Sequence, residues 1–264
     1  MELTDILYEK KDGIAIATFN RPAILNAFRL ATLHEFKSIL DDVQADNTIR
    51  VLIIIGKGRA FSAGIDLKEM ANSSNDVRSL KQEYDELQSI QDVTRRMVHL
   101  PKIIIAAVNG IAVGIGVETA LASDIRLAAD KAIFAFTEVK RALFETNGVT
   151  YILPRLVGLG RAMQMLLTGE IVSAQDALHA GLVTGVVAQE QLMEYAIDLA
   201  LTIAANAPLS VRLVKQTMQK TYDLDLEAMM QLEVDGMMQC TRSEDFIEGF
   251  NAFLEKRQPV YKGK

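Results

Sequence analysis

The stretch that most constrains the fold is a strand-like run followed by glycines and a helix-like pattern, at residues 102–124. Ile103–Val108 is apolar, uncharged and rich in β-branched residues, and it ends at Asn109-Gly110, which predicts a buried strand. Gly114-Ile115-Gly116 follows, and an apolar helical pattern then begins with one acid, Glu118, in its first turn. Free N–H groups and the helix dipole at such a helix start favour an anion. The stretch therefore predicts a place for an oxyanion with one carboxyl group beside it.

A second segment has the same form. The segment 59–67 follows an apolar run at 51–55, has no clean periodicity, and is predicted to be an ordered loop that leads into a helix. If the two strands are neighbours in a parallel sheet, both helix starts lie at one sheet edge. One N–H group from each loop can then bind one carbonyl oxygen and stabilise an enolate or a tetrahedral oxyanion, by ~3–4 kcal/mol per donor. For either loop alone, glycines that only permit a tight turn are the simpler interpretation.

The order of the other patterns predicts an α/β fold. Apolar runs with strand character alternate with helical patterns, which is typical of a layer with largely parallel pairing. The chain is expected to form one domain, with a core at 1–200 and a helical C-terminal region at 201–264. The predicted strands are 6–8, 14–19, 51–55, 103–108, 125–128, 133–135 and 184–187, and the predicted helices are 29–42, 76–98 and most of 189–256.

Composition excludes several classes of function. The 264 residues are 50% hydrophobic and carry a formal net charge of −6, so general attraction to nucleic acid or to an anionic membrane is not expected. Cys240 is the single cysteine and the three histidines have no ligand spacing, so neither a disulfide framework nor a metal site is predicted. The first residues lack the apolar region of a signal peptide, and the uncharged run 103–117 is too short to cross a bilayer. A cytoplasmic protein is expected.

Two acids in apolar surroundings are candidates for proton transfer. Glu118 lies among aliphatic residues, and Glu138 follows Phe134-Ala135-Phe136. Carboxyl groups in such surroundings have raised pKa values and exchange protons near neutral pH. The alternatives are that Glu118 only complements the helix dipole and that Glu138 pairs with Lys140 or Arg141. Spacing alone favours these alternatives.

Two other sites are not supported by the motifs. The order of Gly110, Gly114 and Gly116 is GxxxGxG, and Thr119 stands where a dinucleotide-binding fingerprint has its third glycine. No serine lies in the G-x-S-x-G motif of a nucleophile elbow.

Four segments, at 61–70, 106–129, 153–187 and 249–263, resemble the enoyl-CoA hydratase/isomerase family, also called the crotonase superfamily. With Asn20-Arg21-Pro22 near the start, the resemblance covers almost the whole chain. It implies a spiral of ββα units with a helical C-terminal region that builds trimers and dimers of trimers. It also implies an acyl-CoA thioester as substrate, with CoA as part of the substrate and no separate cofactor or metal.

The resemblance assigns roles to individual residues. It implies that the backbone N–H groups of Ile65 and Ile115 bind the thioester oxygen, and Ile115 stands where many members have glycine. Glu118 and Glu138 match both acids of the hydratases, with Glu118 activating water and Glu138 protonating Cα. The residues that the resemblance places along the CoA thioester are Ala63, Gly64, Asp66, Lys68, Gly114 and Lys256.

One departure from the family pattern lies after the second acid. Hydratases there have a stretch rich in glycine and proline, whereas this chain has Glu145 in place of the proline. Glu145 is either a third acid in the pocket or a surface charge on a shifted loop. Because Glu118 and Glu138 match both acids of the hydratases, an enoyl-CoA hydratase is the first expectation. The alternatives are a Δ3,Δ2-enoyl-CoA isomerase, a hydratase-lyase on an unusual acyl-CoA, and a catalytically silent CoA-binding or assembly protein.

Overall fold

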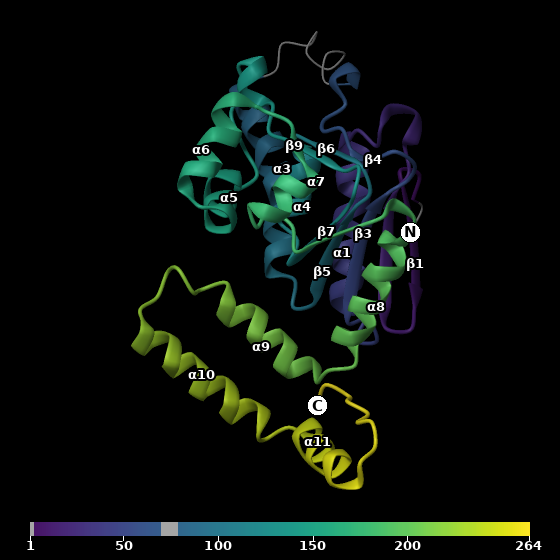
Figure 1. The fold of residues 1–264 in the computed structure, drawn as a ribbon, viewed down its shortest axis with the longest axis vertical. Helices are drawn as coiled ribbons and strands as arrows, with labels where there is room; N and C mark the ends of the chain where they lie inside the picture. Colours follow the sequence, from purple (N-terminus) through teal and green to yellow (C-terminus); the bar gives the residue numbers. More distant parts are fainter. Residues whose placement is uncertain (1–2, 70–78) are drawn as a thin grey trace.

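A computed structural model describes residues 3–69 and 79–264 (Figure 1). Its larger sheet has six strands in the order β1-β2-β3-β5-β7-β10. The hairpin of β1 and β2 is antiparallel, and every later pairing in this sheet is parallel. The strands are β1 (Ile6–Lys11), β2 (Ile14–Phe19), β3 (Val51–Gly56), β5 (Ile103–Val108), β7 (Ile125–Ala129) and β10 (Gly185–Val187). The long apolar runs predicted as strands are all confirmed.

A smaller sheet has four short strands in the order β4-β6-β8-β9. These are β4 (Ala60–Ser62), β6 (Ile111–Val113), β8 (Ile133–Ala135) and β9 (Val172–Ser173). Each of β3, β5 and β7 continues into a strand of this sheet and then into a helical turn, which confirms the expected spiral of ββα units. The prediction of an ordered loop over the whole of 59–67 is wrong at its start, because β4 occupies Ala60–Ser62. Three-residue strands are too short to show an apolar periodicity.

Two glycines allow the chain to turn from one sheet into the other. A Cβ atom on Gly56 would lie 2.1 Å from the carbonyl oxygen of Ala60, and one on Gly110 would lie 2.2 Å from that of Arg59. Real Cβ atoms do not approach backbone oxygens so closely, so only glycine fits at either turn. Backbone packing therefore explains these two positions.

Helices cover the sheets and position the later loops. In the N-terminal half, Phe19 of β2 contacts the rings of Phe28, Phe36 and Phe61, with centroids 4.7–5.6 Å apart.

The predicted helix at 76–98 is observed from Leu80, and residues 76–78 lie outside the described part. The helices are η1 (Pro22–Ile24), α1 (Leu30–Ala45), α3 (Leu80–His99), α4 (Ile115–Leu121), η2 (Glu138–Arg141), α5 (Val149–Val157), α6 (Leu159–Thr168), α7 (Ala174–His179), η3 (Gln189–Gln191), α8 (Leu192–Ala204), α9 (Pro208–Met218), α10 (Leu226–Cys240) and α11 (Glu244–Glu255).

The last three helices extend away from the sheets, as Figure 1 shows in yellow and green. A partly buried ion pair connects α9 to the core, because Lys215 Nζ lies 2.8 Å from Asp124 Oδ2 and also donates to the carbonyl oxygen of Lys102. Among the described helices, none alone is long and apolar enough to span a membrane. The bent pair Gln189–Ala204 and Pro208–Met218 satisfies the length and composition test together, with an angle of 106°.

Candidate active site

The two glycine loops identified from the sequence lie against each other. Strands β3 and β5 are parallel neighbours, with Val51 opposite Ile103, and β4 and β6 continue side by side. A Cβ atom on Gly64 would lie 3.8 Å from the Cα of Gly114, and the reverse distance is also 3.8 Å. The predicted adjacency of the loops is therefore confirmed.

The residues that directly follow these glycines are Ile65 and Ile115, whose backbone N–H groups are the predicted donors. Ile65 forms a bridge with Phe28, but that bridge uses the N–H groups of Phe28 and Asp66. Ile115 is the first residue of α4, so it has no acceptor within the helix. Within residues 3–69 and 79–264, neither group donates a hydrogen bond to the protein. The two amides are available to a ligand oxygen.

The glycines also have structural reasons of their own. The φ angles are +98° at Gly64 and +54° at Gly114, where a side chain would strain the backbone. A Cβ atom on Gly116 would lie 2.4 Å from the carbonyl oxygen of Ser62, so this glycine lets α4 pack closely on β4. The same glycines therefore allow the tight turns and directly precede the two amides.

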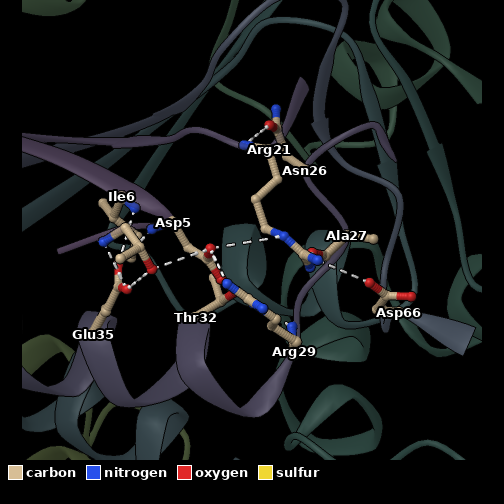
Figure 2. A network of polar contacts seen from close by, with 10 residues as sticks. Asp5, Ile6, Arg21, Asn26, Ala27, Arg29, Thr32, Glu35 and Asp66 are labelled. Atoms are coloured by element: carbon tan, nitrogen blue, oxygen red, sulfur yellow. Dashed lines mark hydrogen bonds and ion pairs between the residues drawn. The ribbon is translucent and has the colours of Figure 1, made fainter. Parts of the chain in front are cut away.

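A network of polar contacts holds the loop that carries Ile65 (Figure 2). Arg21 Nη2 lies 3.1 Å from Asp66 Oδ2, and Arg21 Nη1 donates to the carbonyl oxygen of Ala27 at 2.7 Å. The other carboxyl oxygen of Asp66 accepts hydrogen bonds from the N–H groups of Lys68 and Glu69, so Asp66 caps the helical turn that follows. Both oxygens of Asp66 therefore have protein partners, and its role along the CoA thioester stays a prediction.

Asp5 joins this network to α1. Its carboxylate accepts two hydrogen bonds from Arg29, at 2.7 and 2.8 Å, and one from Thr32 at 2.6 Å, and Arg21 Nε lies 3.8 Å away. Burial opposes ionisation of Asp5, but the hydrogen bonds from Arg29 and Thr32 outweigh it and lower the pKa of this carboxyl group. The N-terminal strand, α1 and the Ile65 loop are thus connected through charged groups (Figure 2).

Three carboxyl groups meet beside the other loop. Glu118 lies in α4, Glu138 begins η2, and Glu145 lies in the loop between η2 and α5. One oxygen atom of each lies within 4.8 Å of the others. Glu118 is 2% exposed and Glu145 is 8% exposed. Glu145 therefore belongs to the cluster and is not a surface charge.

The alternative partners of Glu138 are engaged elsewhere. Lys140 donates to the carbonyl oxygen of Gly169 at 2.6 Å, and Arg141 donates to Thr137 Oγ1 at 2.7 Å. In the described part of the chain neither forms an ion pair with Glu138, and Glu138 Oε2 has no hydrogen-bond partner. A Cβ atom on Gly114 would lie 3.0 Å from Glu138 Oε1, so this acid lies directly at the Ile115 loop.

The environment raises the pKa values of two of these acids, Glu118 and Glu145. Burial raises the pKa of Glu118, and the charge of Glu138 adds to the effect, while a hydrogen bond from Asn147 Nδ2 to Glu118 Oε2 opposes it. Burial and the charges of Glu138 and Glu118 raise the pKa of Glu145 to about 9. Carboxyl oxygens this close can share protons or hold a cation of the Mg²⁺ type.

The remaining predicted residues are spread more widely. Ala63 and Lys68 belong to the Ile65 loop, and Lys68 is exposed. Lys256 follows α11, which Figure 1 places at the far end of the molecule from α4 and β6. Lys256 therefore does not reach the glycine loops of its own chain.

Sequence reasoning missed Asn147, Asp5 and Arg29. Asn147 is buried and contacts Glu118 across 29 positions of sequence, and no spacing pattern indicates such a contact. The Asn20-Arg21-Pro22 motif includes Arg21 of the charged network, but it did not indicate that Asp5 and Asp66 are the partners of this arginine.

The site combines free backbone amides from two adjacent loops with buried carboxyl groups. Amides of this kind can stabilise a carbonyl oxygen that gains negative charge, and the carboxyl groups can transfer protons to and from the same molecule. The chain belongs to the enoyl-CoA hydratase/isomerase family, whose model matches residues 9–264. The family membership that the motifs predicted is therefore confirmed.

Individual relatives match over nearly their full length. The chain is 36% identical to the short-chain-enoyl-CoA hydratase of Clostridium acetobutylicum, over 98% of this chain and 97% of that protein. It is 37% identical to the crotonyl-CoA hydratase of Syntrophomonas wolfei over all of both chains. The crystal structure of an enoyl-CoA hydratase from Bacillus anthracis has a TM-score of 0.93 and 37% identity, over 99% of this chain and 100% of that one. The fold is therefore that of the family.

Proposed function

We propose that this chain is an enoyl-CoA hydratase, a hydro-lyase that adds water reversibly to a 2-enoyl-CoA thioester. The observation that carries the proposal is the pair of acids, Glu118 and Glu138, beside the free N–H groups of Ile65 and Ile115. The hydratases among the relatives support the same reaction.

The proposed mechanism uses the two amides first. The N–H groups of Ile65 and Ile115 donate to the thioester oxygen, which gains negative charge as water attacks Cβ. The carboxylate of Glu118 takes one proton from this water, and the water oxygen forms the bond to Cβ. The carboxylic acid of Glu138 gives its proton to Cα, and the enolate collapses to the 3-hydroxyacyl thioester. The addition of water is redox-neutral overall and needs no oxidant or reductant, and CoA takes part only as the carrier of the acyl group.

The CoA moiety is proposed to run along the Ile65 loop. The residues proposed to line it there with backbone groups and charged side chains are Ala63, Gly64, Asp66 and Lys68. Gly114 is proposed to lie on the opposite side of the thioester. Lys256 directly follows α11, which lies at the end of the molecule away from these loops, and it is proposed to contact the CoA of a neighbouring copy.

A homotrimer or a dimer of trimers is proposed for the assembly. A groove of about 1500 Å³ runs alongside α9, with Val214, Met218 and Tyr222 among its exposed apolar residues. The exposed large apolar side chains on α10 and α11 are Leu226, Met230, Val234, Met237, Met238, Phe246, Ile247, Phe250, Phe253 and Leu254. Apolar surface of this extent is typical of an interface between subunits.

The position of Glu145 favours one second candidate, a Δ3,Δ2-enoyl-CoA isomerase. Its carboxyl group lies within 4.8 Å of both other acids and narrows the room for a water molecule between them. Product analysis separates the two reactions. A hydratase converts a 2-enoyl-CoA to the 3-hydroxyacyl-CoA, whereas an isomerase converts a 3-enoyl-CoA to the 2-enoyl-CoA without adding water. CoA-thioester binding without either product would indicate the binding protein.

A further inference from the structure

Glu145 is a buried acid whose two carboxyl oxygens both lack a hydrogen-bond partner within the described chain. Glu118 Oε1 and Glu138 Oε2 are also without a hydrogen-bond partner in the described part of the chain, whereas Oε2 of Glu118 accepts a hydrogen bond from Asn147. Buried polar atoms normally have partners, so these oxygens call for an explanation. The acids lie within 4.8 Å of one another, and protons shared among them would satisfy the oxygens.

The charges of the cluster support shared protons. The nearest basic side chains on the same segment, Lys140 and Arg141, are bonded to other groups, and the charged groups that face Glu145 in the described chain are Glu118 and Glu138. Three carboxylates at this separation repel one another in a buried site. Glu145 therefore carries a proton at neutral pH, which agrees with the rise of its pKa to about 9.

The proposed hydration leaves the two catalytic acids in the wrong protonation states. Glu118 ends the reaction with the proton from water, and Glu138 ends it as a carboxylate. Before the next hydration, a proton has to return from Glu118 to Glu138. Glu118 is almost completely buried, so direct exchange with bulk water is hindered.

We propose that Glu145 returns this proton, receiving it from Glu118 on one oxygen and delivering its own proton to Glu138 from the other. One O–H bond breaks on Glu118 as one forms on Glu145, and the original O–H bond of Glu145 breaks as one forms on Glu138. The charge of Glu145 is unchanged, and no other reactant is needed. A carboxyl group with both oxygens free is the group that this transfer requires.

The loop that carries Glu145 is held on both sides. Gln91 Nε2 of α3 donates to the carbonyl oxygen of Thr146 at 2.7 Å, and Asn147 bonds Glu118. The N–H of Leu143 donates to the carbonyl oxygen of Glu138 at 3.0 Å. These bonds hold the loop in a position where one oxygen of Glu145 lies within 4.8 Å of an oxygen of each of the other two acids. Glu145 acts through Glu118 and Glu138 and does not contact the reacting atoms. Its proposed role is to restore the protonation states of these two acids between turnovers.

The relay rests on the proposed function and is tested by separating the first turnover from later ones. The variant Glu145→Gln keeps the shape of the side chain, but its amide does not pass on a carboxyl proton. On rapid mixing with crotonyl-CoA, its first turnover should stay within about threefold of wild type and its steady-state rate should fall at least about tenfold. The result is a burst of one product per site.

Two variants serve as controls. Glu145→Asp keeps a carboxyl group and should recover part of the steady-state rate. Glu194→Gln removes an exposed acid on α8 and should leave both phases unchanged. In wild type the steady-state rate should also fall above about pH 9, where Glu145 loses its proton, and Glu145→Gln should lack this decline.

Several results would overturn the relay. One is a Glu145→Gln variant in which both phases slow equally, which would assign Glu145 to the chemical step or to packing. Another is a variant in which neither phase changes. Activation of wild type by Mg²⁺ would place a cation between the carboxylates in place of a proton. A wild type without hydratase turnover would overturn the proposed function and the relay with it.

Discussion

The Nδ2 group of Asn147 donates a hydrogen bond to Oε2 of Glu118, and both residues are buried. The bond connects the loop after η2 to α4. A donor to a carboxylate stabilises its charged form, so Asn147 opposes the effect of burial on the pKa of Glu118. The asparagine thereby helps to keep Glu118 available as the base that we propose.

Removal of this donor should shift the pH dependence of catalysis. In Asn147→Ala the pKa of Glu118 should rise, because burial is then less opposed. The acid limb of kcat/KM should move to higher pH, and the value at pH 7 should fall about tenfold or more. Asn47→Ala, which changes an exposed asparagine, is the control. An unchanged acid limb would contradict the assigned role of Asn147.

Gly114→Ala should disturb the acid as well as the backbone. The new Cβ atom would lie 3.0 Å from Glu138 Oε1, at a φ of +54°. We expect kcat to fall by about 10- to 100-fold, since displacement of a catalytic group by a fraction of an ångström to 1 Å has effects of this size. Gly158→Ala is the matched control, because Gly158 also has a positive φ but has no atom within 4 Å of the new Cβ. It should lower Tm and leave kcat unchanged. Equal losses of kcat in the two variants would contradict the prediction.

Arg21→Met tests the network that holds the Ile65 loop. The variant leaves Asp66 Oδ2 and the carbonyl oxygen of Ala27 without their donor. We expect a loss of stability of about 1–3 kcal/mol and a fall in kcat of about tenfold, because the N–H of Ile65 is no longer fixed. Urea unfolding and steady-state kinetics measure the two effects. Arg242→Met, at an exposed arginine, should change neither, and a normal kcat in Arg21→Met would separate the network from catalysis.

The stability of wild type should fall as the pH rises toward 9, in part because of Glu145. The folded chain keeps the proton of Glu145 up to about pH 9, whereas the unfolded chain releases it near the ordinary value of 4.5. Between these values the unfolded state binds fewer protons, so stability decreases with pH. Glu145→Gln should therefore have a higher Tm than wild type at pH 8, by at least about 2 °C, which corresponds to roughly 1 kcal/mol for a chain of this size. The difference should shrink toward pH 5. A Tm difference independent of pH would contradict the proposed protonation state.

The sequence predicted the parts of the site that have local signatures. Long β-branched runs indicated β3 and β5, and the glycines before Ile65 and Ile115 indicated two loops at one sheet edge. The short strands β4 and β6 have no such signature, because three residues show no periodicity.

The contacts between distant segments were beyond local patterns. The bond from Asn147 to Glu118 and the ion pair from Arg21 to Asp66 join residues 29 and 45 positions apart, and tertiary packing sets both. The motifs identified Glu145 as a departure but left open whether it is buried. Its position in the acid cluster followed only from the fold.

The most direct test of the two-acid hydratase is the loss of conjugated enoyl-thioester absorbance when the purified protein is mixed with crotonyl-CoA. Wild type, Glu118→Gln and Glu138→Gln are compared at one pH. We expect rapid loss with wild type and a rate lower by at least about 100-fold in each variant, because a positioned acid or base contributes roughly 10²–10⁴-fold. Full activity in either variant, or a wild type that leaves crotonyl-CoA and other 2-enoyl-CoA thioesters unchanged, would contradict the two-acid account.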